Sequence, residues 1–374
     1  MAKLLIEVGG IDVNAAGAHG ETPLHVASLF NSQNIVKLLL SHGQIKPHAT
    51  IKGQWTPLHC AAVKDSVEVA KLLIEVDGID VNAVAADGKT PLHVASVYNS
   101  PNIAKLLLSH EQIKPHATNK DQWTPLHFAA VEDSAEVAKL LIETGRTPLQ
   151  RTASDNSMNV AKFRLSNIKK NCEARDRDDL TPLHRAAIND AFGVAKLLLE
   201  VHGIDVNAAQ GKCCVPPLHF AAINNSLRVA QLLLAHTQIQ HDARVTTPLH
   251  AAAHNDSLEV ATRLLQVDVI DVNAANDDGT TALHVAAVKN SCKVSELLLA
   301  HKQIECDARD KNQRTALHYA AAEDSFEVAK LVLQADGVDV NARDANGKTP
   351  FECATNVNGL TVAELLAMES SMIV

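Results

Sequence analysis

The chain has 374 residues, with 34 Lys and Arg against 43 Asp and Glu, which gives a formal net charge of −9. This charge argues against a nucleic-acid surface, because such surfaces concentrate positive charge. No apolar run is long enough to cross a membrane, and no basic-then-apolar segment marks a signal peptide. The seven cysteines are odd in number and scattered, which is typical of reduced thiols and predicts a cytoplasmic protein.

A four-residue phrase, Thr-Pro-Leu-His or a close variant, recurs along the chain, mostly at intervals of 34 residues. Self-similarity at such a period indicates a stack of repeats, which offers a long surface and not a single site. The phrase begins at Thr22, Thr56, Thr90, Thr124, Thr181, Pro216, Thr247, Thr281, Thr315 and Thr349, with a weaker copy at Thr147.

Each unit predicts two short helices. In one unit, Thr56 with the following proline starts the first helix, and Ser66 is expected to cap the second. Val69, Leu72 and Leu73 lie on one apolar stripe of the second helix. Helices of about ten residues are too short to be stable alone, so each unit must bury its stripe against its neighbours.

The residue that ends each first helix is always Asn or Asp. These are the non-glycine residues that best tolerate a positive φ, so a left-handed residue is expected at this slot. The slot is filled by Asn31, Asp65, Asn99, Asp133, Asn156, Asp190, Asn225, Asp256, Asn290, Asp324 and Asn358.

After the helix pair, the segments 79–82 and 87–88 read as an extended turn with a hairpin tip. With TPLHxAA, VAKLLL and DVNAxxxDG in frame, the sequence resembles the ankyrin-repeat family over essentially its whole length. The resemblance implies an all-α ankyrin-repeat solenoid. In it, helix-turn-helix units stack, carry short β-hairpin loops and form a concave groove.

The repeats divide the chain into five parts: a partial repeat 1–21, a stack 22–144, a degenerate repeat 145–180, a second stack 181–348 and a capping repeat 349–374. In the middle part Gln150 replaces the histidine and Arg164 replaces a core leucine. Two interpretations stay open: a decayed repeat, or a hinge between the two stacks.

The histidines invite a metal or catalytic interpretation. The resemblance implies that those of the repeated phrase instead bind the threonine hydroxyl and the neighbouring loop. Adjacent copies would lie about 10 Å apart, too far to share zinc. No nucleophile–base set or Gly-rich phosphate loop is present, so we expect no cofactor, no metal and no enzyme activity. These histidines are His25, His59, His93, His127, His184, His219, His250, His284 and His318.

Partners of this family usually meet the hairpin tips and the exposed side of the first helices. Trp55 and Trp123, the only tryptophans, lie two repeats apart at equivalent positions, and tryptophan is enriched at interface hot spots. The alternative is that both rings pack over neighbouring hairpins. The full candidate set is Trp55, Trp123, Phe30, Tyr98, Lys64, Lys89 and Glu132.

The resemblance therefore implies a monomeric, non-enzymatic protein-interaction scaffold or adaptor. One alternative is the repeat arm of a larger membrane channel, toxin or cytoskeletal anchor, which the half-repeat at Met1 suggests. Another is a substrate receptor of a ubiquitin ligase. Finally, four hairpin asparagines resemble targets of the asparaginyl hydroxylase that acts on ankyrin repeats: Asn82, Asn207, Asn273 and Asn341.

Overall fold

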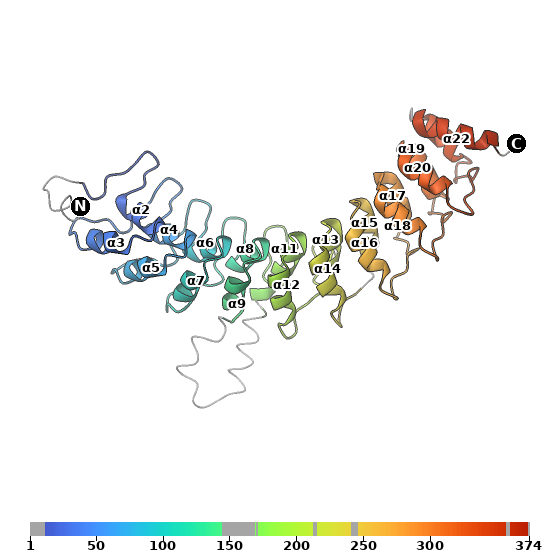
Figure 1. Ribbon diagram of the computed structural model, residues 1–374. Helices are drawn as coiled ribbons and strands as arrows, with labels where there is room; N and C mark the ends of the chain where they lie inside the picture. The colour runs from blue at the N-terminus through green and yellow to red at the C-terminus, as the bar shows by residue number, and fades with distance from the viewer. Residues whose placement is uncertain are drawn as a thin grey trace. The chain divides into compact units, whose positions relative to one another are not determined.

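The computed structural model of the chain describes residues 12–143, 169, 171–211, 215–240, 246–356 and 360–372. It divides into two compact units, Met1–Asp205 and Val206–Val374. In both units the described residues form pairs of antiparallel helices (Figure 1). The predicted all-α stack of helix pairs is therefore confirmed.

In the first unit, each repeat contributes one helix to an inner row and one to an outer row. The inner row is α2 (Pro23–Leu29), α4 (Pro57–Val63), α6 (Pro91–Val97), α8 (Pro125–Val131) and α11 (Pro182–Ile188). The outer row is α3 (Gln33–Leu40), α5 (Val67–Ile74), α7 (Pro101–Leu108), α9 (Ala135–Glu143) and α12 (Phe192–Leu199).

The second unit repeats this arrangement. Its first helices are α13 (Pro217–Ile223), α15 (Pro248–His254), α17 (Ala282–Lys289), α19 (Ala316–Ala322) and α21 (Pro350–Asn356). Its second helices are α14 (Leu227–Leu234), α16 (Leu258–Leu265), α18 (Cys292–Leu299), α20 (Phe326–Leu333) and α22 (Leu360–Met372).

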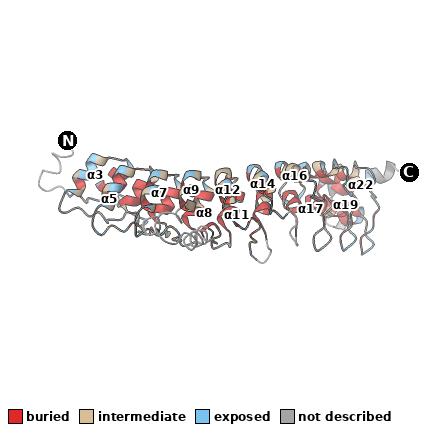
Figure 2. Cartoon of the chain, turned by 90° about the horizontal axis from the view of Figure 1, so that it is seen from below, coloured by how far each residue is buried: buried red, intermediate tan, exposed pale blue. Residues whose placement is uncertain are grey.

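The core of each unit is a layer of small and branched apolar side chains between the two rows of helices. Leu58, Ala61 and Ala62 of α4 are at most 2 % exposed, and so are Val69 and Leu73 of α5. Figure 2 shows this layer in red along the helix pairs, with exposed residues on their outer sides. The alanines let neighbouring first helices approach closely, as the sequence predicts.

The left-handed slot at the end of the first helix is confirmed wherever the structure describes it. Asp65 has φ 51°, and the equivalent residues of the other described repeats lie between 48° and 53°. Asn156 and Asn358 lie outside the described residues. The slot has a second function that the sequence did not indicate: Oδ1 of Asp65 accepts a hydrogen bond from the backbone N–H of Ile103 in the next repeat, at 2.8 Å.

The predicted cap at Ser66 is wrong. Ser66 occupies the N-cap position of α5, but its side chain makes no capping hydrogen bond. At the equivalent position of the next repeat, the Ser100 hydroxyl donates to the carbonyl of Ala62 at 2.6 Å. The free N–H of the first turn of α7 is instead satisfied by Asp65 of the preceding repeat, so the cap is supplied between repeats.

The hairpins are tight turns without regular strands in the described residues, apart from one isolated bridge between Gln210 and Val215. One tip is closed by the N–H of Ala85 donating to the carbonyl of Lys89 at 2.8 Å. Neighbouring tips are joined by single backbone hydrogen bonds, such as that from Ala86 to Gly53 at 2.7 Å. The row of hairpins is thus held edge to edge.

The structure places residues 171–180 differently from the sequence-based division. Helix α11 packs directly on α8, and α12 packs on α9. His127 of α8 bonds to the carbonyl of Leu180, 53 residues later, whereas His59 bonds to a residue 30 positions later and His219 to one 27 positions later. Residues 171–180 therefore complete the repeat begun at Thr124. The division and hinge proposed for 145–180 otherwise rest largely on 144–168, which lie outside the described residues.

The double function of Asp65 predicts a graded series of substitutions. Asp65→Asn should change stability by less than about 0.5 kcal/mol, because Asn225 already fills the same slot and caps Val260. Asp65→Gly keeps the left-handed backbone but loses the cap, at a cost of about 1 kcal/mol. Asp65→Ala loses both and should cost about 2–3 kcal/mol.

Hydrogen exchange at the Ile103 amide separates the two effects. We expect protection of this amide to fall in the glycine and alanine variants and to persist in the asparagine variant. Equal loss of stability in all three variants would contradict the assignment of separate backbone and capping functions to Asp65.

Candidate interaction surface

The repeated threonine and histidine form one bridge from each repeat to the next. In the repeat begun at Thr56, Nδ1 of His59 accepts a hydrogen bond from the Thr56 N–H at 3.1 Å and lies 2.8 Å from the Thr56 hydroxyl. Nε2 of the same ring lies 3.1 Å from the carbonyl of Lys89, at the hairpin of the next repeat. The predicted histidine function is confirmed.

This geometry determines the protonation of the ring. A carbonyl oxygen can only accept, so Nε2 of His59 must carry the proton and Nδ1 must be the acceptor. Burial lowers the pKa of His59 and of His93 to about 4, because a charged imidazolium would lose its hydration. His59 and His93 are thus structural and neutral at pH 7.

One repeat lacks half of this bridge. Pro216 stands where the other repeats have threonine, and it offers neither an N–H nor a hydroxyl. Nε2 of His219 still bonds to the carbonyl of Thr246 at 2.7 Å, but Nδ1 is buried without a partner among the described residues.

The hairpin asparagines form a second connection between repeats. Nδ2 of Asn82 donates to the carbonyl of Gln112, and its Oδ1 accepts from the N–H of Lys114, both at 2.8 Å. Asn207 and Asn273 make the same pair of bonds to the next loop. We call this pair of bonds the asparagine clamp. Asn341 is exposed, and its side chain makes no hydrogen bond to another described residue. Hydroxylation of these four residues stays a prediction.

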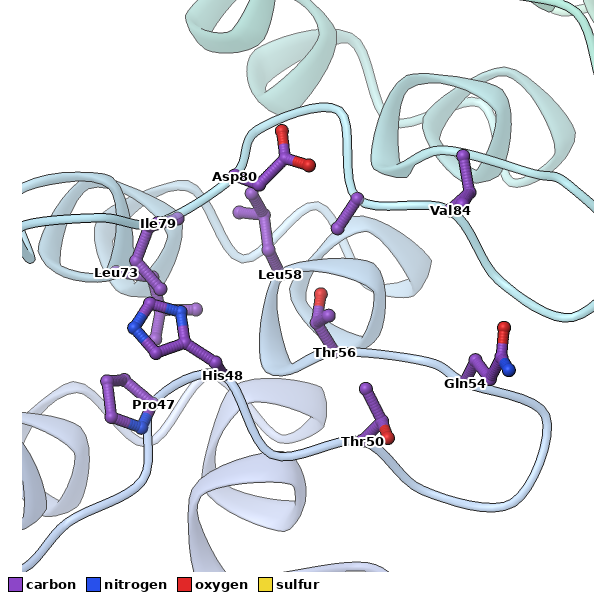
Figure 3. Close-up of a pocket in the computed structure, with 11 residues that line it drawn as sticks. Pro47, His48, Thr50, Gln54, Thr56, Leu58, Leu73, Ile79, Asp80 and Val84 are labelled. Atoms are coloured by element: carbon purple, nitrogen blue, oxygen red, sulfur yellow. The ribbon is translucent and has the colours of Figure 1, made fainter.

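The clamp is missing between the loops of the repeats begun at Thr22 and Thr56, because His48 occupies the position of Asn14 and Asn82. The His48 side chain makes no hydrogen bond to another described residue. A cavity of about 200 Å³ lies here between two successive loops, with Leu58, Leu73 and Ile79 at its apolar side (Figure 3). His48 and Asp80 also line it and are exposed (Figure 3).

Trp123 is half-buried, because its ring is covered from two sides. The ring centroid of Phe128 lies 4.9 Å away, and the guanidinium carbon of Arg185 lies 4.3 Å from the indole centroid. Arg185 is itself held by Asp176 at 2.7 Å and Asp178 at 2.6 Å. The interpretation that the tryptophan packs against neighbouring repeats therefore describes Trp123.

Trp55 is also half-buried, but its ring has fewer partners. Its ring partner among the described residues is the imidazole of His59, at 5.8 Å between centroids. Lys89, another predicted site residue, is half-buried and places its ammonium 5.2 Å from the Phe128 centroid. It also pairs with Asp87 at 3.0 Å.

The other four predicted site residues cap the first helices and are exposed. Phe30 after α2 is 70 % exposed and Tyr98 after α6 is 51 % exposed, which is unusual for aromatic side chains. Lys64 and Glu132 occupy the same position in the repeats between and after them. Aromatic and charged residues therefore alternate along this edge of the first unit.

Among the described residues, no group of three or more His, Cys, Asp or Glu side chains is arranged to hold a metal ion. None of the described helices has both the length and the apolar character needed to cross a bilayer.

Models of ankyrin repeats in three copies match residues 1–85, 46–119, 78–145, 142–210 and 218–310. Models of ankyrin repeats in many copies match residues 192–234 and 297–354. The chain belongs to the ankyrin-repeat family. A search of curated proteins found no match. Ankyrin repeats are generally protein-interaction modules and are typically non-catalytic.

Two surface residues of the ankyrin stack that contact Trp123 were not among the predicted site residues. Phe128 and Arg185 follow the histidine of their repeats, a position held by Cys60 and Val94 in the repeats before them. A comparison of that position along the repeats would have shown the change from small to large side chains. The 34-residue period does not predict the contact of Arg185 with Trp123, because Thr124 and Thr181 are 57 residues apart.

The ankyrin histidines predict a loss of stability in mild acid. The unfolded chain binds protons near pH 6.5, whereas folded His59 stays neutral until about pH 4. The stabilisation is therefore complete above about pH 7 and is lost as the pH falls toward 4. His59 alone should lower the unfolding free energy by about 2 kcal/mol between pH 7 and pH 5.

Urea unfolding midpoints at pH 7, 6 and 5 measure this slope. His59→Gln, which keeps a donor and an acceptor but does not titrate, should show a shallower slope. An NMR titration in which the folded His59 ring protonates near pH 6.5 would contradict the prediction.

Proposed function

We propose that this ankyrin-repeat protein is a non-enzymatic scaffold or adaptor that binds a protein partner on the inner side of its first unit. The observation that carries the proposal is the exposure of Phe30 and Tyr98, at 70 % and 51 %. Large apolar side chains lose stabilisation of about 25 cal/mol per Å² when left in water, so a partner that covers them gains this free energy.

The backbone of the inner face is also preorganised for binding. The histidine bridges and asparagine clamps hold the backbone of one repeat to the next, so little backbone order has to be gained on docking. Trp55 supports the same proposal, because no Phe or Arg of the described residues covers its indole as Phe128 and Arg185 cover that of Trp123. We propose further that the protein acts as a cytoplasmic monomer.

The alternatives place the same surface in other settings. As an arm of a membrane channel, toxin or cytoskeletal anchor, or as the substrate receptor of a ubiquitin ligase, the stack would use the inner face in the same way. The partner distinguishes these settings, and the surface test below applies to each of them.

The test compares two pairs of substitutions in the same two repeats. Phe30→Ala with Tyr98→Ala changes the inner face, and Lys37→Ala with Lys105→Ala changes exposed residues on the outer helices α3 and α7. A partner captured from the native cell is purified and titrated by calorimetry against the full chain. We expect the inner pair to weaken binding by about 2 kcal/mol or more, roughly 30-fold, as at interface hot spots.

The outer pair should leave affinity within about a factor of two, because exposed charges away from an interface contribute little. A partner whose affinity depends on Lys37 and Lys105 and not on Phe30 and Tyr98 would overturn the proposed surface. Circular dichroism of both variants checks that the helices remain folded.

A further inference from the structure

The two tryptophans occupy the same backbone site, two repeats apart. Beside Trp123, the N–H of Arg177 donates to the carbonyl of Asp121 at 2.9 Å, and that of Asp176 donates to Leu180 at 3.0 Å. Beside Trp55 the equivalent bonds run from Ala86 to Gly53 at 2.7 Å and from Ala85 to Lys89 at 2.8 Å. The two indoles can therefore be compared position by position.

At Trp123 the chain supplies its own arginine. Arg185 belongs to the next repeat in the stack and lies with its guanidinium carbon 4.3 Å from the indole centroid. Its Nε donates to Asp176 at 2.8 Å, and its terminal nitrogen pairs with Asp178 at 2.6 Å. The arginine side chain is only 13 % exposed, so the site excludes most water from the cation.

At Trp55 the same site has one of the two carboxylates but no arginine at the equivalent position. Val94 stands at the position of Arg185, is 1 % exposed and carries no charge. Asp87 stands at the position of Asp178, while Ala85 replaces Asp176. Cys60 replaces Phe128, and its thiol is much smaller than a phenyl group, so it can cover far less of the ring.

We infer that Trp55 and Asp87 form a binding site for the guanidinium group of an arginine on the protein partner. The guanidinium would stack on the indole, as Arg185 stacks on Trp123, and pair with the Asp87 carboxylate. A planar guanidinium can stack and pair at the same time, whereas an ammonium binds as a point charge. The net charge of −9 favours a basic segment in the partner.

Lys89 modulates this site. Its ammonium pairs with Asp87 at 3.0 Å and also lies 5.2 Å from the Phe128 centroid. An incoming guanidinium shares Asp87 with Lys89, which keeps its contact with Phe128. At Trp123 the equivalent residue is the uncharged Leu180, which does not compete with Arg185. Lys89→Leu should therefore strengthen arginine binding at Trp55.

The inference rests on the proposed function and names a chemical feature of the partner. Its test needs no partner. The full chain is labelled with ¹⁵N at tryptophan, which gives two indole N–H signals in an NMR spectrum. The probe is the peptide acetyl-Gly-Arg-Gly-amide, and its control contains citrulline, which has nearly the same shape without the charge.

We expect the arginine peptide to shift the Trp55 signal in a saturable way and to leave the Trp123 signal in place. The citrulline peptide should bind at least about ten-fold more weakly, since both the cation–π contact and the charged hydrogen bonds are lost. Equal binding of both peptides, or no saturable shift of Trp55, would overturn the inference.

Two exchanged variants provide matched controls. Val94→Arg copies Arg185 next to Trp55 and should remove binding there. Arg185→Val copies Val94 next to Trp123, and the Trp123 signal should then respond to the peptide. Asp87→Asn, at an exposed position, covers the case in which a variant at Val94 or Arg185 does not fold, and it should weaken the peptide-dependent shift of the Trp55 signal while both indole signals remain observable. If the peptide shifted the Trp123 signal of the wild-type chain and not the Trp55 signal, the inferred site at Trp55 would be wrong.

The outcomes separate the two proposals. If the peptide does not bind while Phe30 and Tyr98 still determine affinity for a captured partner, the arginine site is wrong and the interaction surface stands. If the peptide binds at Trp55 but the inner-face substitutions leave partner affinity unchanged, the guanidinium site stands and the proposed surface is wrong.

Discussion

The hydrogen bond from each histidine to the carbonyl of the next hairpin is the constraint on which the stack depends. It joins the start of one repeat's first helix to the residue that precedes the next repeat, as His59 does with Lys89. Because that residue also lies on the inner face, the bridge that holds two repeats together sets the position of a surface side chain. Stability and recognition are therefore coupled through the backbone, while the surface side chain itself can vary.

The repeat period explains how much of this could be predicted from the sequence. The helix starts, the left-handed Asp65 slot and the function of the histidines follow from local chemistry that recurs in every unit. The cap supplied by Asp65 to Ile103 was missed, because only a left-handed backbone was predicted for Asp65 and the serine that precedes each second helix, Ser100 in this case, was the nearer candidate. The placement of residues 171–180 was missed because the extra residues between Thr124 and Thr181 look like an additional unit, whereas α11 packs on α8.

The candidate surface was only partly predictable for a related reason. Exposure of Phe30 and Tyr98 follows from their position after the last turn of a short helix. The difference between the two tryptophans does not, because it depends on what the next repeat presents at one position, arginine or valine. A repeat protein specifies its contacts through neighbours in space, and these are neighbours in sequence only when the register is unbroken.

The asparagine clamp has a mechanical consequence. Asn14 and Asn82 each tie their loop to the next, whereas His48 between them does not, so the repeats between residues 12 and 115 are joined more strongly within pairs than between them. Force applied along the chain would separate the weaker interfaces first and release repeats two at a time. Thr22 to Thr90 is 68 residues, so each event would lengthen the chain by roughly 230 Å. The stack would then extend in long steps, each of which corresponds to two repeats.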